Sequence, residues 1–268
     1  MPEGTSPLLL REDSEAGVTR LTLNKPESRN SLSFAMMGAV LDALRQVGSD
    51  HAVRVVVLAA AGPVFCAGHD LREITAHRAD ADAGRDFFDA AMRRCADLMQ
   101  AIVALPQPVI AEVQGVATAA GCQLVATCDL AVAAEAARFC TPGVDIGLFC
   151  STPAVALSRA VAAKPAMEML LTGEMIGAEE ARRIGLINRV VAGDALRGAT
   201  MELAAKIAAR SAHTVRIGKA AFHRQRGLPL DQAYAHCAAV MTENLMAADA
   251  AEGIGAFLGK RKPVWQDR

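Results

Sequence analysis

The chain has 268 residues, with 28 Lys and Arg against 29 Asp and Glu, so its formal net charge is -1. A near-neutral chain without a basic run cannot neutralise many phosphates, and we expect no nucleic-acid partner. Hydrophobic residues make up 52% and charged residues 21% of the sequence, an ordinary balance for a globular protein. No stretch has the length and apolarity of a membrane span or of a signal-sequence core, and we expect a cytoplasmic protein.

The seven cysteines show no CxxC pair and no zinc-finger spacing, and several stand inside apolar runs. This pattern predicts reduced, buried thiols with a filling role and no bound metal. The cysteines are Cys66, Cys95, Cys122, Cys128, Cys140, Cys150 and Cys237.

The first elements alternate between strand and helix. Residues 17–24 place apolar side chains at alternate positions and end before Pro26, which predicts a short strand. Ser33 then has the position of an N-cap for a helix that closes at Gly48. Residues 53–62 are β-branched and apolar without interruption, as in a strand buried on both faces.

The same alternation continues with a helix over residues 87–105 and a second buried strand over residues 108–115. From about Asp194 onward only helical patterns remain, over residues 195–210, 212–226, 230–247 and 248–258. We therefore predict an α/β core over residues 1–195 and a helical C-terminal region over residues 196–268. The helices of this region have apolar faces, which contain Leu203, Ile207, Val215, Phe222, Val240, Met241 and Leu245.

Several catalytic signatures are absent: GxGxxG, GxxxxGK[ST], GxSxG and HExxH do not occur. What remains is a pair of loops rich in small residues, GPVFCAGHDL at residues 62–71 and QGVATAAGCQL at residues 114–124. In the second loop Ala119, Ala120 and Gly121 fall at the expected first turn of a helix. Its N–H groups and dipole could hold an oxyanion, or the small residues could serve only close packing.

Six segments give the chain a resemblance to the crotonase (enoyl-CoA hydratase/isomerase) superfamily, within it to the enoyl-CoA hydratase domain-containing branch. They are NKPESRNSLS, FCAGHDL, PVIAEVQGVATAAGCQLVATCDLAVAA, FCTPGVDIGL, MEMLLTGEMIGAEEARRIGLINRVV and EGIGAFLGKRKPVW, in the family's order. The resemblance implies a spiral of ββα units and assembly as a homotrimer or dimer of trimers. It also implies that residues 196–268 are a trimerisation region whose apolar faces pack on neighbouring copies. It also implies an acyl-CoA substrate, with coenzyme A entering as part of that substrate and no permanently bound cofactor.

By the same resemblance, the backbone N–H groups of His69 and Ala120 are the oxyanion donors. The two glutamates of true hydratases match Gln123 and Gly143, neither of which is an acid. Ordinary hydration therefore lacks its acid-base groups, and Asp145 is the nearest acid by position. We leave Asp145 open between a buried acid of raised pKa and a loop carboxylate bonded to backbone amides.

The resemblance places coenzyme A along one loop and two basic residues. The loop residues are Ala67, Gly68, His69, Asp70 and Leu71, while Arg29 borders the adenine end and Lys260 reaches the phosphates, often from a neighbouring subunit.

For three side chains near these loops, the sequence leaves two possible roles open. Asp70 is either the N-cap of a following helix or a catalytic residue, and Ser151 is either a second N-cap or a pocket-lining residue. The His69 imidazole is a hydrogen-bonding residue or a base. A glutamate at Gly143 would be strained if the backbone there has positive φ.

Two functions fit the sequence. One is an enzyme that acts on an acyl-CoA thioester through an oxyanion-stabilised, enolate-like intermediate, nominally an enoyl-CoA hydratase/isomerase. The other is a non-catalytic acyl-CoA-binding or sensing protein that kept the binding loops without the acids.

Overall fold

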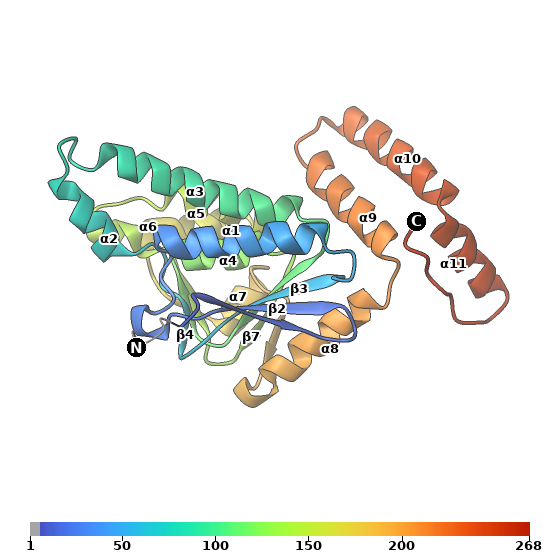
Figure 1. The fold of residues 1–268 in the computed structure, drawn as a ribbon. Helices are drawn as coiled ribbons and strands as arrows, with labels where there is room; N and C mark the ends of the chain where they lie inside the picture. The colour runs from blue at the N-terminus through green and yellow to red at the C-terminus, as the bar shows by residue number, and fades with distance from the viewer. Residues whose placement is uncertain (1–5) are drawn as a thin grey trace.

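The computed structural model describes residues 6–268 (Figure 1). Residues 1–5, part of the N-terminal segment in which we expect no signal sequence, lie outside the described residues. The core holds a six-stranded sheet in the order β1-β2-β3-β5-β7-β10, in which only β1 runs antiparallel to its neighbour. Its strands are β1 (Leu9–Asp13), β2 (Val18–Leu23), β3 (Val55–Ala60), β5 (Val109–Val113), β7 (Leu130–Ala134) and β10 (Arg189–Val191).

A second, four-stranded sheet has the order β4-β6-β8-β9. Its strands are β4 (Val64–Cys66), β6 (Val116–Thr118), β8 (Arg138–Cys140) and β9 (Ile176–Gly177). The units β3-β4-α2, β5-β6-α4 and β7-β8-α5 each give one strand to each sheet, which confirms the expected spiral of ββα units. The sequence patterns did not predict this second sheet or β1.

The helices of the core include α1, whose N-cap prediction is confirmed because the Ser33 side chain accepts a hydrogen bond from the Met36 N–H at 3.1 Å. The helices are α1 (Phe34–Ser49), α2 (Leu71–Ala76), α3 (Arg85–Ala104), α4 (Ala120–Thr127), α5 (Ser151–Ala160), α6 (Ala163–Thr172) and α7 (Ala178–Arg183). Short 3-10 turns stand at η1 (Pro26–Ser28), η2 (His77–Ala79), η3 (Pro142–Ile146) and η4 (Gly193–Ala195).

The six-stranded sheet is covered on both faces. One face carries a large hydrophobic cluster with α1, α3 and α4, and the other carries a smaller cluster under α8 (Leu196–Ala208). Leu203 and Ile207 pack against this smaller cluster. Our expectation that these two residues face a neighbouring copy is wrong, because the sheet of the same chain is their partner. By packing, α8 belongs with the core.

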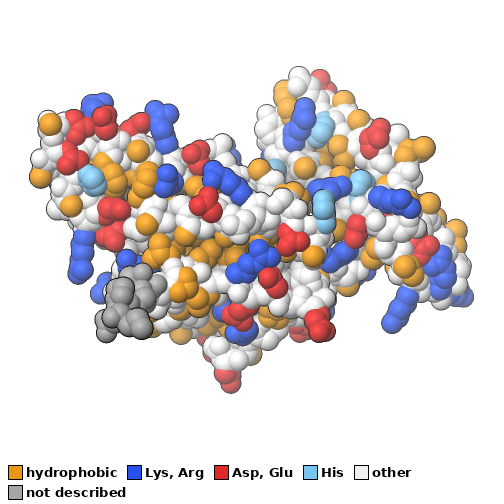
Figure 2. Space-filling model, viewed as in Figure 1, with side chains coloured by type: hydrophobic (Ala, Val, Ile, Leu, Met, Phe, Trp, Pro, Cys, Tyr) orange, Lys and Arg blue, Asp and Glu red, His pale blue; other side chains and the backbone are white. Residues whose placement is uncertain are grey.

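The remaining helices α9 (Ala212–Gln225), α10 (Leu230–Met246) and α11 (Ala248–Leu258) confirm the expected helical pattern. We call these helices and the following residues to 268 the arm, which extends away from the sheets (Figure 1). Large hydrophobic side chains reach its surface (Figure 2), among them Phe222, Leu230, Tyr234, Met241, Leu245, Met246, Ile254, Phe257, Leu258 and Val264. Within residues 6–268 no helix has the length and apolarity needed to cross a membrane.

Candidate active site

The two small-residue loops meet because the strands before them are neighbours. Strands β4 and β6 pair in parallel, with Cys66 opposite Ala117, so the loops leave the same edge of the sheet. Gly68 has φ +85°, and a Cβ atom placed on it would lie 3.2 Å from the Ala120 nitrogen and 2.9 Å from the Ala119 Cβ. Only glycine combines this backbone conformation with so close an approach.

The turn into α4 is strained at Ala119, which has φ 48° and ψ -118°. Its N–H donates to the Cys140 carbonyl and its carbonyl accepts from the Gln123 N–H, each at 3.0 Å. A Cβ on Gly121 would lie 2.1 Å from the Cys66 carbonyl oxygen, so α4 begins against β4. The small residues therefore do serve close packing, and they also fix a strained turn of the kind that accumulates at functional sites.

Two backbone donors lie beside this contact. Among residues 6–268, the N–H groups of His69 and Ala120 make no hydrogen bond to a protein acceptor. Ala120 is the first residue of α4, where the helix dipole is positive and N–H groups lack partners within the helix. The arrangement can stabilise negative charge on an oxygen placed between the loops.

The His69 imidazole is largely buried, and this burial lowers its pKa, which keeps the ring neutral near pH 7. Its Nε2 atom has no hydrogen-bond partner among the described residues. The structure leaves both alternatives for this side chain in place.

Asp70 acts as the N-cap of α2, as predicted. Its Oδ1 accepts from the N–H groups of Arg72 and Glu73 at 3.0 and 3.3 Å, and its Oδ2 accepts from the Ser31 hydroxyl at 3.2 Å. The carboxylate is thus committed to the start of α2, and the adjoining Leu71 is half-exposed.

The two residues that the resemblance aligns with the hydratase glutamates, Gln123 and Gly143, are both buried. Gln123 is buried in α4, and its Oε1 lies 3.7 Å from the Cys95 Sγ, which donates to it from α3. Gly143 is buried in η3 with negative φ, so the strain that we foresaw from positive φ does not apply. A side chain at this position would instead be too crowded, because its Cβ would lie 2.7 Å from the Leu148 carbonyl oxygen and 2.8 Å from the Cys150 Sγ.

The structure places Asp145 differently from both of our alternatives. Its side chain is exposed, and among the described residues it makes no hydrogen bond to a backbone amide. Asp145 lies within η3, and the residues that follow it, through the left-handed Gly147 (φ +76°) to Phe149, are exposed as well.

The predicted N-cap role of Ser151 is wrong. Helix α5 begins at Ser151, so the N-cap position falls on Cys150, which makes no capping hydrogen bond through its side chain. The Ser151 hydroxyl donates instead to the Phe149 carbonyl at 3.4 Å. A pocket-lining role for Ser151 stays a prediction.

The folded chain brings together only some of the residues that we expect to bind coenzyme A. Arg29 is exposed in a left-handed conformation, and its carbonyl accepts from the Ala67 N–H at 3.1 Å, which ties it to the first loop. Lys260 follows α11, at the opposite end of the molecule from α2 and β4 (Figure 1). Within one chain Lys260 therefore does not approach the loops.

Asn30 is a structural residue that the sequence analysis missed. It is fully buried with φ 51°, its Oδ1 accepts from the Lys25 N–H at 2.9 Å, and its Nδ2 donates to the carbonyls of Ala61 and Val64 at 2.8 Å each. These bonds hold the turn that carries Arg29 against the β3-β4 connection. The available signal was the residue type, because asparagine tolerates the left-handed region and bonds to nearby backbone.

The cysteines form no disulfide, and most are buried. Burial raises the pKa of Cys66 to about 12 and the pKa values of Cys95 and Cys140 to about 11. Such thiols stay protonated at neutral pH and are poor nucleophiles, as expected of filling residues. Within residues 6–268 no three His, Cys, Asp or Glu side chains are grouped as metal ligands.

Comparison with known proteins identifies the family to which the chain belongs. The family described as enoyl-CoA hydratase/isomerase matches residues 13–268. The mitochondrial enoyl-CoA hydratase domain-containing protein 3 is 47% identical over 94% of this chain and 84% of the Xenopus laevis protein, and 46% identical over 93% of this chain and 80% of the human one.

Two solved structures share the fold. A crystal structure of enoyl-CoA hydratase from Mycobacterium smegmatis has a TM-score of 0.93 and 50% identity, covering 97% of this chain and 99% of that one. A crystal structure of human enoyl-CoA hydratase domain-containing protein 3 has a TM-score of 0.91 and 44% identity, covering 97% of this chain and 100% of that one. The chain thus has the crotonase fold and belongs to the enoyl-CoA hydratase/isomerase family.

Proposed function

We propose that this protein binds an acyl-CoA thioester with its carbonyl oxygen at the N–H groups of His69 and Ala120. The observation that carries this proposal is the contact at Gly68, which brings the first loop against the start of α4 and leaves both donors without a protein acceptor in the described chain. Each donor to a developing oxyanion is worth roughly 3 to 4 kcal/mol of barrier. Removal of a proton from the carbon next to the carbonyl would then give an enolate held by these amides.

The residues at the family's acid positions favour enolate chemistry other than ordinary hydration. An amide at Gln123 cannot exchange a proton near neutral pH, and Gly143 supplies no side chain. Each general acid or base contributes typically about 10²- to 10⁴-fold to a rate. The proposed reaction class is therefore enolate formation on a CoA thioester, as in an isomerase or lyase.

A second candidate is an acyl-CoA-binding or sensing protein without catalysis. Three observations favour it: Gln123 is engaged with Cys95, Gly143 is crowded, and Asp145 points to solvent in a single chain. Both candidates require thioester binding. They differ in whether the α-proton of the bound thioester exchanges with water.

The deciding experiment incubates the protein with saturated and unsaturated acyl-CoA thioesters in heavy water and measures deuterium uptake by mass spectrometry. Exchange supports the enolate proposal whatever the net reaction. Measured binding without exchange across the panel supports the sensing protein, and the absence of binding contradicts both.

We also propose that the protein assembles as a homotrimer or a dimer of trimers, with no permanently bound cofactor and a cytoplasmic location. The exposed hydrophobic side chains of the arm support assembly, because a monomer rarely leaves so many apolar groups in water. A neighbouring arm could also bring Lys260 to the loops. Light scattering at micromolar concentration tests this, and a clean 28.1 kDa particle would contradict it.

A further inference from the structure

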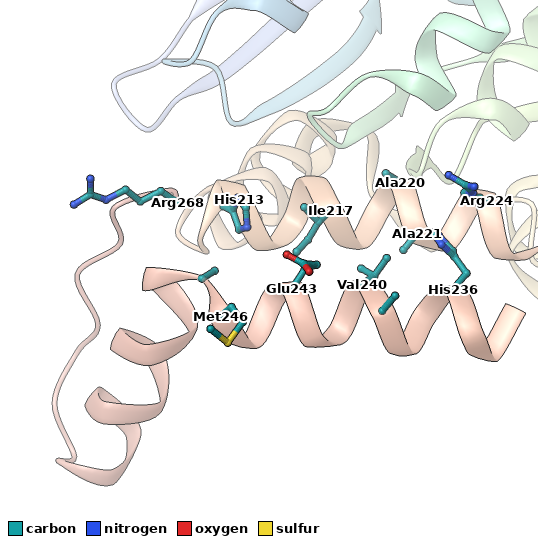
Figure 3. A pocket seen from close by; sticks show the side chains of 12 residues that line it. His213, Ile217, Ala220, Ala221, Arg224, His236, Val240, Glu243, Met246 and Arg268 are labelled. Carbon is teal, nitrogen blue, oxygen red and sulfur yellow. The ribbon is translucent and has the colours of Figure 1, made fainter.

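The arm is joined to the core by polar contacts. Neither hydrophobic cluster of the described chain contains a residue of α9, α10 or α11. Helices α9 and α10 pack on each other and leave between them a groove of about 670 Å³, lined by residues such as Ile217, Val240 and Glu243 (Figure 3). The apolar packing of the arm is thus internal, and other interactions must hold it at its angle to the sheets.

The most buried of these interactions centres on Lys219 of α9. Its Nζ donates to the carbonyls of Ile102 and Gln107 at 3.0 Å each and to the Asp129 Oδ2 at 2.7 Å. These acceptors come from the end of α3, the segment before β5 and the segment after α4. Since an ammonium group has three hydrogens, the Lys219 cation is fully satisfied.

Asp129 is held in turn by the core and the arm. Its Oδ2 also accepts from the Val109 N–H at 2.8 Å, and the His223 Nε2 lies 3.3 Å from its Oδ1. The side chains of Lys219 and Asp129 are only 7% and 18% exposed. A pair this buried is weakly screened, and removing one partner is strongly destabilising locally.

A second attachment lies at the start of α9. Asp267 accepts from the Ala212 N–H at 2.7 Å and pairs with Arg54 at 2.7 Å, and the Trp265 Nε1 donates to the Ala209 carbonyl at 2.9 Å. Ala212 and Lys219 are separated by about 10 Å along the helix axis at 1.5 Å per residue. A helix held at one point can swing, whereas a helix held at two points cannot.

A third contact, from the Arg226 guanidinium to the Arg159 carbonyl, lies at the end of α9. It is exposed, so it constrains the helix much less than the buried ion pair does.

We propose that Asp129, Lys219 and His223 form a latch that sets the angle of the arm, and that opening the latch frees the arm to swing about residues 209–211 while the core stays folded. The latch thereby controls where the exposed apolar side chains of the arm are presented to a neighbouring copy. This inference does not depend on acyl-CoA chemistry, and its failure would leave the proposed function untouched.

Hydrogen exchange on the full chain tests the latch through two variants. Lys219→Met removes the ammonium and keeps an unbranched side chain, while Lys219→Met with Asp129→Asn leaves no unpaired charge. Lys206→Met is the matched control, because its ion pair with Glu202 on α8 is about 60% exposed. All proteins are compared at the same assembly state.

Helix α9 has only 14 residues and is marginally stable once it is detached from the core, so its hydrogen bonds should open more often. We expect its amides to exchange at least about tenfold faster in both latch variants, with β3, β5 and α4 at wild-type rates and the control unchanged. Wild-type exchange in α9 would overturn the proposal. An equal acceleration over the whole chain, or a double variant that fails to fold, would also overturn it, because the pair would then stabilise the core itself.

Discussion

Gly143→Glu tests whether the chain can accept a carboxylate at the position that the resemblance aligns with a hydratase glutamate. The Cβ of any new side chain would lie 2.7 Å from the Leu148 carbonyl oxygen and 2.8 Å from the Cys150 Sγ. Contacts under 3.0 Å do not persist, so the segment from Gly143 to Cys150 must move. Overpacking of this kind costs about 1 to 3 kcal/mol, which lowers the melting temperature by roughly 2 to 12 °C for a chain of this size.

The matched control is Gly198→Glu, which makes the same substitution on α8 where no heavy atom lies within 4 Å of the new Cβ. Because glutamate favours the helix over glycine by up to about 1 kcal/mol, this variant should be as stable as the wild type or slightly more stable. Thermal unfolding followed by circular dichroism measures both variants. Adding Cys150→Ala to Gly143→Glu should restore only part of the loss, since the contact with the backbone at Leu148 remains.

Equal melting temperatures for Gly143→Glu and the wild type would refute the crowding argument. The loop of residues 143–150 would then be adaptable enough to admit a carboxylate, and the absence of the acid would reflect substrate chemistry alone.

Three further outcomes are expected. Ala120→Pro should lower the rate of deuterium uptake at the α-carbon of the bound thioester about 10²-fold or more and should nearly keep the affinity for the CoA thioester, because proline fits the first helical position but has no N–H. Deuterium uptake at the wild-type rate in an assembled variant would remove Ala120 from the oxyanion site. Lys260→Ala should weaken binding of a CoA thioester but not of the pantetheine thioester, with a loss that shrinks as salt rises, and equal losses would point to assembly. Burial raises the pKa of Cys66 from 9.0 to about 12, so between these pH values the thiol ionises only in the unfolded chain. The free energy of unfolding should therefore fall above about pH 9 by up to about 1.4 kcal/mol per pH unit for each such thiol. Denaturant titrations at several pH values measure this slope, and a free energy that does not change with pH would contradict the argument.

The long elements could be predicted because their apolar spacing has a single explanation. The run after Ser33 and the four helical patterns beyond residue 195 all appear as helices, and residues 53–62 contain a fully buried strand. The second sheet could not be predicted, because three of its strands have three residues and the fourth has two. The repeated unit was also hidden, since β3, β5 and β7 begin at the unequally spaced positions 55, 109 and 130.

Part of the candidate site could likewise be predicted from the sequence, and part could not. Its two loops could be recognised from small residues after buried strands, and the Asp70 cap from residue type and position. Three features depend on how distant segments close on each other: the strained backbone of Ala119, the bonds of Asn30 and the exposure of Asp145. No pattern of neighbouring residues carries that information. The proposed contact of Lys260 with coenzyme A would depend on another copy, which a single sequence does not contain.

The last prediction concerns crotonyl-CoA itself, which the wild type should hydrate at least about 10³-fold more slowly than a hydratase with both acids. Gln123→Glu should fit, because the two side chains are nearly isosteric, and should raise hydration only modestly while Gly143 stays without an acid. Loss of the enone absorbance measures each rate. Brisk hydration by the wild type would overturn the argument from the missing glutamates. The base would then be another group, either the His69 imidazole or an acid that assembly brings into the site. The exposed Asp145, whose apolar neighbours Ile146 and Phe149 also face solvent, is the acid that a neighbouring copy could bury.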